Sequence, residues 1–262
     1  MLKTMSIITL TTDWGWADYY VAAVKGVILS KCPDAIIVDV SHDVAHHNRN
    51  SAAFILRNVY PNFPKGTIHV IGVDSEEALD KPHVVVECEG HYFIGADNGI
   101  FSLIIGEKPY KAVYLDLVQD TEYFTFPTRD RFAKTAVSIA HGMQLSDIGK
   151  PYEITKMVES QPAVKADSIQ GMVTYIDDFG NAITNISKDL FQQVGAGRKF
   201  KIILRAKKYA IDKISDSYHD VPIPEMVAIF GSHGFVEIAN NMGNLSELLG
   251  IARNTKVFVN FE

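Results

Sequence analysis

The sequence predicts an α/β N-terminal domain, with a mostly parallel sheet and flanking helices, followed by a small all-β, barrel-like C-terminal domain. Two observations predict this arrangement. β-branched runs alternate with helical patterns as far as residue 141, and after residue 168 short strand-like runs separated by turns follow one another. The first pattern is typical of βαβ units, and the second of an antiparallel sheet or barrel. An irregular stretch with two prolines separates them, so we expect domains at 1–165 and 166–262.

The N-terminal half begins with a βαβαβ pattern. Runs rich in β-branched residues predict three strands, at 7–10, 35–40 and 67–73. Apolar residues recur at helical spacing between these runs, which predicts helices over 18–31 and 48–59. Pro33 and Pro61 end the two helices, because proline cannot extend a helix. We therefore expect parallel strands joined by helical crossovers.

The remaining elements are shorter and are separated by turns. After the third strand we expect a hairpin with strands at 83–87 and 92–96, a strand at 113–116 and a helix over 130–141. In the C-terminal domain, six short runs predict strands at 170–176, 182–186, 200–204, 226–230, 235–238 and 257–261.

The composition is that of an ordinary folded protein with a mildly acidic balance. The chain has 262 residues, and its 25 basic and 31 acidic side chains give a formal net charge of −6. The densest basic run, 198–208, is interrupted by an apolar stretch, so we expect no nucleic-acid partner. No apolar run approaches the roughly 18 residues of a membrane span, so we expect no membrane partner and a cytoplasmic location. Cys32 and Cys88 lie far apart, which indicates neither a disulfide nor a thiolate metal site.

Common catalytic signatures are missing from the sequence. No phosphate-binding loop follows the first strand, and the usual zinc-peptidase and serine-hydrolase motifs do not occur. Open α/β sheets bind ligands where their parallel strands end, and polar clusters occupy three such positions here. The first cluster contains Asp13, which can accept hydrogen bonds from two ribose hydroxyls. It also contains Asp18, for which capping of the next helix is the favoured interpretation.

The other two clusters follow the second and third strands. The second contains the adjacent histidines His46 and His47 near carboxylates. Paired histidines can bind a metal, but neighbours in sequence point in different directions and no spaced third ligand is evident. A surface loop, or contacts with an organic ligand, is therefore the favoured interpretation, and we predict no metal site. The third cluster begins with Asp74, whose carboxylate can orient a water molecule or lie in a solvated turn.

Two turns of the C-terminal domain, at 175–186 and 230–241, concentrate hydrogen-bonding groups beside an aromatic residue. Taken alone, each is a β-turn with a polar tip. With the N-terminal clusters they form an ordered series: Thr12–Gly15 with Asp18 and Val21, Asp39–His42, Asp74, Ala96–Gly99, Thr125–Phe126 with Arg129–Asp130, Asp178–Asn181 with Thr184–Asn185, and Gly231–Ser232 with Gly234, Glu237–Ala239 and Asn241. This series resembles the family of S-adenosylmethionine-dependent hydroxide adenosyltransferases, whose relatives are the adenosyl-fluoride and adenosyl-chloride synthases.

The resemblance implies an α/β N-terminal domain, a barrel-like C-terminal domain and a homotrimer whose ligand sites lie at subunit interfaces. S-adenosylmethionine is then the substrate, and no cofactor is implied. By position, Asp13 would hold the ribose hydroxyls. The amino acid end of the ligand is a zwitterion next to a sulfonium, which requires carboxylates for its ammonium and neutral donors for its carboxylate. The positions implied for it are Asp177 or Asp178, with Asn181 and Ser232, and those implied for the adenine are Phe179 and Phe235.

The chain departs from this family where water is activated. Hydrolytic members are similar to one another in an Asp, a following Arg and a His within a T-F-H-G-R-D segment. Here Asp74 remains, Lys81 is the cation nearest to the Arg position, and Pro127 stands at the His position. Proline has no side-chain donor or acceptor. Thr128 follows, and its hydroxyl can contact a halide or a water. Candidates for a replacement imidazole are His83 and His91.

We therefore predict an S-adenosylmethionine hydrolase that forms adenosine and methionine by displacement at the ribose 5′ carbon. Its modified catalytic site comprises Asp74, Lys81 and Thr128. Neutral methionine is a good leaving group, so positioning and desolvation of the nucleophile can supply much of the rate. Two alternatives stay open. One is a non-catalytic protein that binds or senses an adenosyl ligand, which Pro127 favours, and the other is an adenosyl-halide synthase, which rests on Thr128 alone.

Overall fold

The computed structural model describes residues 5–116, 122, 124–205 and 209–262. The chain divides into two compact units, Met1–Val158 and Glu159–Glu262. The second unit includes the short strand β7 (Ala163–Lys165), which pairs with β8 (Ser168–Ile176). The boundary expected near residue 165 from the sequence therefore falls at the end of β7, whose three residues are too few to form a recognisable pattern. Within the described residues, no helix has the length and apolar character needed to cross a membrane.

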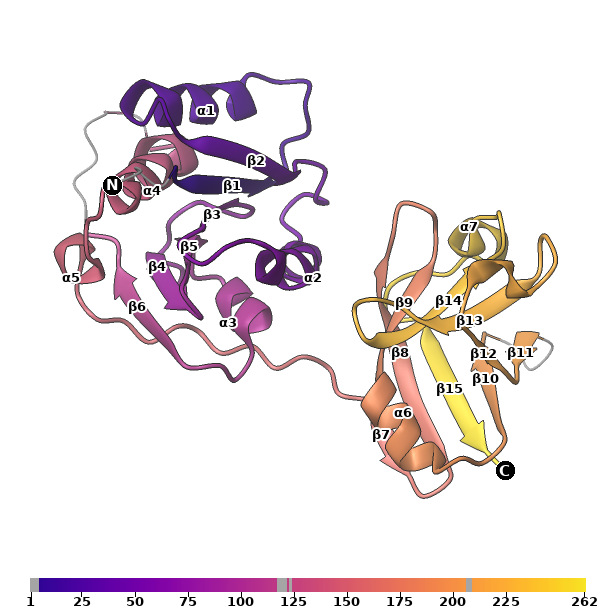
Figure 1. Cartoon of the computed structure of the whole chain (residues 1–262). Coiled ribbons are helices and arrows are strands. Elements are labelled where there is room, and N and C mark those ends of the chain that lie inside the picture. The colour runs from indigo at the N-terminus through magenta and orange to yellow at the C-terminus, as the bar shows by residue number, and fades with distance from the viewer. Residues whose placement is uncertain (1–4, 117–121, 123, 206–208) are drawn as a thin grey trace. The chain divides into compact units, whose positions relative to one another are not determined.

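The N-terminal unit is built on a six-stranded sheet in the order β2-β1-β3-β5-β4-β6 (Figure 1). The first four strands in that order are parallel, and β4 is antiparallel to both of its neighbours. The predicted α/β class is therefore confirmed. The strands span β1 (Ile7–Thr12), β2 (Ile36–Ser41), β3 (Ile68–Gly72), β4 (His83–Cys88), β5 (His91–Ala96) and β6 (Tyr110–Tyr114).

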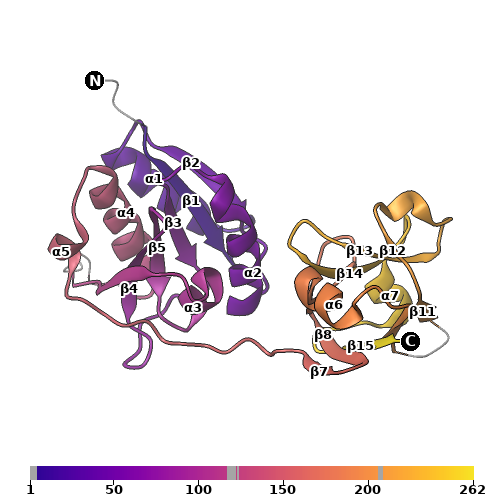
Figure 2. The ribbon, with the colours of Figure 1, turned by 60° about the horizontal axis from the view of Figure 1, so that its bottom comes forward.

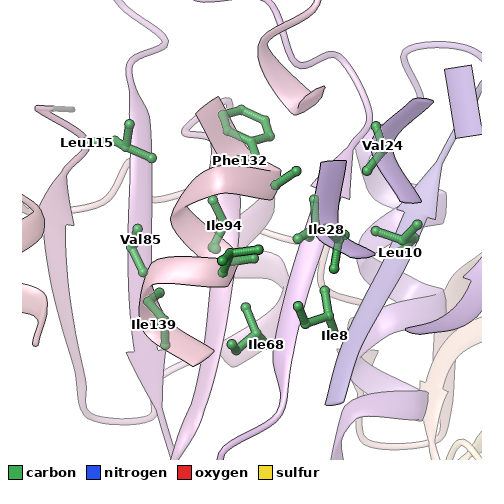
Figure 3. Close-up of a cluster of buried hydrophobic side chains, with 14 of the residues drawn as sticks. Ile8, Leu10, Val24, Ile28, Ile68, Val85, Ile94, Leu115, Phe132 and Ile139 are labelled. Atoms are coloured by element: carbon green, nitrogen blue, oxygen red, sulfur yellow. The ribbon is translucent and has the colours of Figure 1, made fainter. Parts of the chain in front are cut away.

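Helices cover both faces of this sheet (Figure 2). On one face, α1 (Tyr20–Lys31) and α4 (Ala133–Ala140) share an apolar core with strand residues such as Ile8 and Val85 (Figure 3). On the other face, α2 (Arg49–Val59) and α3 (Ile100–Ile105) surround Phe93. Each fully buried side chain of this size contributes about 1.5–3 kcal/mol. Burial on both faces explains why these strands are continuous apolar runs, which is typical of parallel sheets.

Several helical segments of the N-terminal unit differ from the sequence-based expectation. The sequence does not predict α3, because its residues are apolar on every side and show no helical period. The helix expected over 130–141 begins earlier, with one π-helical turn, η2 (Thr128–Phe132), that runs into α4. Two further short segments are not evident from the sequence, η1 (Tyr60–Asn62) and α5 (Leu145–Ile148).

The C-terminal unit is a mainly antiparallel, barrel-like sheet in the order β11-β10-β15-β8-β9-β14-β13-β12 (Figure 1). This confirms the predicted all-β class. The other expected strands are β9 (Ala182–Ser187), β10 (Phe200–Leu204), β13 (Met226–Phe230), β14 (Phe235–Asn240) and β15 (Lys256–Phe261). The sequence does not predict the short elements α6 (Lys188–Gly195), β11 (Ala210–Ile211), β12 (Ile214–Ser215), η4 (Tyr218–Asp220) and α7 (Leu245–Leu249).

A neutral histidine is buried in the N-terminal unit. His69 of β3 is fully enclosed, its Nδ1 lies 2.8 Å from Thr9 Oγ1, and its Nε2 lies 3.2 Å from His91 Nδ1. Burial lowers the pKa of His69 to about 3, and the nearby His91 contributes to this shift. The folded chain therefore keeps this ring neutral at pH values where an exposed histidine, with a pKa of about 6.5, takes up a proton.

The neutral state of His69 predicts acid sensitivity. Between about pH 6.5 and the lowered pKa, the unfolded chain binds one more proton at this site than the folded chain, so stability is complete above pH 6.5 and falls on acidification. One such site contributes about 1.4 kcal/mol per pH unit. We expect the free energy of unfolding of His69→Phe, measured by urea denaturation between pH 7 and 4, to fall less steeply than that of the wild type by this amount. Equal slopes would contradict the buried neutral state.

Candidate functional site

Two carboxylates follow neighbouring parallel strands at one edge of the N-terminal sheet. Thr12 at the end of β1 pairs with Gly72 at the end of β3. Asp13 follows Thr12 directly and Asp74 follows Gly72 after one residue, so both lie at the carboxyl ends of these strands. The helix after β1, α1, and the helix after β2, α2, cover opposite faces of the sheet. The strand order therefore reverses between β1 and β3. Open α/β sheets bind ligands at such a switch point.

A cavity of about 430 Å³ opens at this edge and is called here the switch-point cavity. Its size lies within the range of small-molecule sites. Four carboxylates line it and make it suited to a cationic ligand: Asp13, Asp18, Asp74 and Glu76. The rest of the lining consists of Trp14, Tyr20, His46, His47, Ser75, Thr125 and Phe126. The described residues contain no cluster of three or more His, Cys, Asp or Glu side chains arranged to hold a metal.

Asp13 is held in place by the loop that follows β2. Its side chain is 6% exposed, and its Oδ2 accepts a 2.7 Å hydrogen bond from the backbone N–H of His47. Asp18 does not cap α1, so that interpretation is wrong. The cap position is Tyr19, no side chain there accepts a hydrogen bond from the helix, and Asp18 lines the cavity instead.

The loop after β2 rests on a buried histidine. The two ring nitrogens of His42 lie 2.7 Å from Thr12 Oγ1 and 2.9 Å from Asp39 Oδ1, and the imidazole is almost fully enclosed. Asp39 also accepts a 2.6 Å hydrogen bond from Lys25. Burial acts to raise the pKa of the Asp39 carboxyl, but the hydrogen bonds from Lys25 and His42 outweigh it and hold the pKa below its usual value. This network ties the β2 loop to the end of β1, where Asp13 lies.

Asp74 is fixed through both of its carboxylate oxygens. Lys81 Nζ donates to Oδ1 at 2.8 Å, and Asn98 Nδ2 donates to Oδ2 at 3.3 Å. The structure therefore brings together Asp74 and Lys81, the cation identified from the sequence. Asp74 also has a φ of +48°, in the left-handed region that few side chains other than glycine adopt readily. Aspartate is one of the few residues with a side chain that tolerate this region.

The other sequence-predicted residues of this region are placed differently. Pro127 lines a neighbouring cavity of about 650 Å³ together with His83. Thr128 does not line the switch-point cavity; its side chain is fully enclosed, and its Oγ1 has no hydrogen-bond partner among the described residues. A solitary buried hydroxyl is costly unless something binds it.

Neither His83 nor His91 is placed to replace an imidazole at Asp74. His83 Nε2 lies 2.9 Å from the carbonyl oxygen of Ser75, and its Nδ1 lies 3.0 Å from Arg131 Nη1, so both ring nitrogens are engaged. Burial lowers the pKa of His83 to about 4, and the nearby Arg131 adds to this effect. His91 lies at the start of β5 beside His69 and Tyr60. The sequence could propose these residues but could not locate them.

The C-terminal unit contains a second cavity of about 650 Å³, called here the barrel cavity. Of the residues predicted from the sequence, Asp177, Phe179 and Asn181 line it, whereas Asp178, Ser232 and Phe235 do not. The other lining residues were not singled out as site residues by sequence reasoning: Tyr218, His219, Asn240, Asn241, Met242, Gly243 and Asn244. They come from segments about 40 to 65 positions further along the chain, so spacing near Asp177 could not reveal them, although Asn241 belongs to the last of the ordered motifs.

Asp177 and Asn181 form a closed turn at the mouth of the barrel cavity. Asp177 Oδ1 accepts from the Asn181 backbone N–H at 2.8 Å, and its Oδ2 accepts from Asn181 Nδ2 at 2.9 Å. Phe179 at the tip is 78% exposed, so its ring is available to a flat ligand. The buried side-chain oxygens of Asn240 and Asn241 have no partner among the described residues, which leaves two acceptors unused in this lining.

A hydrogen-bond chain connects the barrel cavity to the turn that contains Ser232. Tyr218 donates to Glu237 Oε1 at 2.6 Å, and His233 Nε2 lies 3.1 Å from Glu237 Oε2. Burial raises the pKa of the Tyr218 hydroxyl, and its hydrogen bond to Glu237 adds to the effect, so this tyrosine remains a neutral donor. Ser232 is exposed beside this chain.

Each of the two units matches a domain of one known protein family. The SAM hydroxide adenosyltransferase N-terminal domain, where SAM denotes S-adenosylmethionine, matches residues 8–149, and the C-terminal domain of the same family matches residues 171–258. The chain belongs to the SAM hydroxide adenosyltransferase family. The resemblance of the ordered motifs to this family is thereby confirmed.

Relatives within the family carry two kinds of name. The chain is 32% identical over 259 residues to the (R)-S-adenosyl-L-methionine hydrolase of Methanocaldococcus jannaschii, with 94% of this chain and 93% of the relative covered. It is 27% identical to a fluorinase of Nocardia brasiliensis, with 92% of each chain covered. A crystal structure of an uncharacterized conserved protein from Thermotoga maritima has a TM-score of 0.87 at 27% identity, covering 97% of this chain and 99% of that one.

Proposed function

We propose that this chain hydrolyses S-adenosyl-L-methionine to adenosine and L-methionine by displacement at the ribose 5′ carbon. The observation that carries the proposal is that Asp13 and the Asp74–Lys81 pair line or adjoin one cavity at the switch point of the sheet. The four carboxylates of that lining suit the positively charged sulfonium of the substrate. Membership of the family and the hydrolase names of its relatives support the same reaction.

Asp13 is proposed to hold the ribose. A carboxylate has about four lone-pair positions, so Asp13 can accept both ribose hydroxyls while keeping its bond from the His47 N–H. Such a bidentate contact fixes the sugar and therefore the direction in which the 5′ carbon faces.

Asp74 is proposed to orient the attacking water. The Lys81 and Asn98 contacts hold its carboxylate in one position, and a fixed acceptor at that place can direct a water lone pair at the 5′ carbon. The water oxygen then forms the new bond to carbon, the carbon–sulfur bond breaks, and its electron pair returns to the sulfur of methionine. One water proton is released. Lys81 acts here through Asp74.

The barrel cavity is proposed to bind the remaining parts of the ligand. Phe179 offers a face for the adenine, and Asp177 and Asn181 offer a carboxylate and an amide for the amino acid end. Roles for Asp178, Ser232 and Phe235, which do not line this cavity, rest on the family resemblance alone. The proposal includes a homotrimer in which each ligand contacts two subunits, as the family resemblance implies.

The test below also distinguishes two alternative functions, a non-catalytic binding protein and a halide-dependent enzyme. Pro127 offers no side-chain hydrogen bond, which favours a protein that binds or senses an adenosyl ligand without turning it over. The unpartnered hydroxyl of Thr128 is the feature that favours a halide-dependent reaction.

The proposal is tested by incubating the purified protein with S-adenosylmethionine, as separate sulfonium epimers, and separating the products by chromatography. We expect adenosine and methionine in equal amounts, at a rate above the protein-free control and independent of chloride. Calorimetry measures binding in parallel. Binding without products would establish the sensor instead, a chlorinated adenosyl product would establish the halide synthase, and absence of binding would overturn the ligand assignment.

A further inference from the structure

His47 faces Asp74 across the switch-point cavity. Its Nδ1 lies 3.9 Å from Asp74 Oδ1, and its side chain is 80% exposed. Its own backbone N–H donates to Asp13, so the residue connects the two carboxylates of the site. The main chain of His47 is therefore fixed by its hydrogen bond to Asp13, and its imidazole is open to a ligand.

Both facing residues have unusual backbone conformations. His47 has a φ of +57° and Asp74 a φ of +48°. Glycine adopts this region without cost, whereas a side chain other than Asn or Asp is strained there by about 1 kcal/mol or more. Of the two, His47 is the strained residue, and a strained residue whose side chain lies beside a carboxylate of the cavity indicates that the side chain itself is required.

The distance between the two side chains fits one bridging water molecule. At 3.9 Å, the Nδ1 and Oδ1 atoms are too far apart for a direct hydrogen bond. They are close enough for a single water to donate one hydrogen to each of them, at ordinary hydrogen-bond lengths of about 2.8 Å. Such a water is held through both hydrogens, and its lone pairs are left free to attack.

We propose that His47 is the general base of this site and that, with Asp74, it clamps the nucleophilic water. This inference rests on the proposed hydrolase activity. As the water oxygen bonds to the ribose 5′ carbon and the sulfur departs with the carbon–sulfur electron pair, one proton passes from the water to His47 Nδ1. The resulting imidazolium faces the Asp74 carboxylate, which stabilises it, and the proton is later released to solvent.

The charged groups around His47 are consistent with this role. Asp74 faces the imidazole from the loop after β3, and Lys81 forms an ion pair with the same carboxylate oxygen, Oδ1. Asp13, in the loop after β1, accepts the hydrogen bond from the His47 backbone N–H. His46 is its neighbour on the same loop, and Asp18 and Glu76 line the cavity beside it. The carboxylates in this group outnumber the single cation Lys81, so the site can balance the positive charge that a general base acquires when it accepts the proton.

The test replaces His47 by asparagine, because asparagine tolerates a left-handed backbone and keeps the N–H that Asp13 accepts. We expect kcat to fall by about 10²-fold or more, with KM changed by less than about threefold. The wild-type rate is expected to fall on acidification, because a general base acts only in its unprotonated form, and this fall is expected to be absent in the variant. His47→Gly, which keeps the backbone and leaves a space, is expected to regain activity when imidazole is added.

The matched control is His141→Asn, the same substitution at an exposed histidine at the end of α4, which is expected to retain the wild-type rate. Thermal unfolding and calorimetric binding of S-adenosylmethionine show whether His47→Asn is folded and binds. A folded variant with wild-type turnover overturns the role of His47 and leaves the proposed function intact. A wild-type protein that binds the substrate but forms no adenosine overturns both.

Discussion

Replacing Asp74 by asparagine is expected to lower the rate of adenosine formation by about 10²- to 10⁴-fold, the range that a single positioned acid–base group contributes. Asparagine has the same shape but carries no charge, so Lys81 loses its ion pair, and the water loses an anionic acceptor. Substrate affinity is expected to change less than the rate, because three of the four carboxylates of the switch-point cavity and the whole barrel cavity are untouched. Steady-state kinetics and calorimetry, performed on the same preparation, separate the two effects.

A neighbouring carboxylate provides the control for this substitution. Asp80 lies on the same loop as Asp74, is exposed, and does not line the switch-point cavity. Asp80→Asn changes the net charge of the loop by the same amount and is expected to retain turnover. The stability cost of Asp74→Asn is expected to stay below about 1 kcal/mol, since partly exposed ion pairs contribute little. An unchanged rate in Asp74→Asn, with wild-type turnover measurable, would remove Asp74 from the mechanism.

Much of the N-terminal fold follows from the sequence because strands buried on both faces are apolar runs bounded by helices of regular period. This is why Asp13 and Asp74 could both be identified: each follows such a run directly. α3 escapes prediction because an apolar surface on every side has no period to detect. The nearness of Asp74 and Lys81 depends on how the intervening loop folds, and the sequence suggests the pair only through resemblance to a family.

The remaining site residues depend on conformations that residue types do not specify. His47 stands beside His46 in a polar loop, and only its left-handed backbone turns it toward Asp74. Asp177 and Asp178 are equivalent by sequence, and the hydrogen bonds of the turn distinguish them, since both of the turn's side-chain bonds go to Asp177. Which of these two carboxylates contacts a ligand is still a prediction.

Gly180, in the turn between Asp177 and Asn181, allows a second prediction of large effect. Gly180→Ala is expected to lower the free energy of unfolding by about 3 kcal/mol and to weaken substrate binding at least about tenfold. Gly180 has a φ of +82°, which strains any residue with a side chain. An added methyl group would also overlap the side-chain oxygen of Asn244. That oxygen accepts a 3.0 Å hydrogen bond from the Glu247 N–H and so caps α7.

A second glycine separates the two causes. Gly197 has a φ of +78°, but a methyl group there would meet no atom within 4 Å. Gly197→Ala is therefore expected to cost only the backbone strain, about 1 kcal/mol, and to bind substrate normally. The free energy of unfolding is measured by denaturant unfolding and the substrate affinity by calorimetry. The difference between the two variants in each quantity is the effect of displacing Asn244. Because Asn244 lines the barrel cavity, this displacement reaches the lining as well as the helix cap. Equal losses in both variants would mean that the close packing of the turn against Asn244 matters neither to stability nor to the cavity.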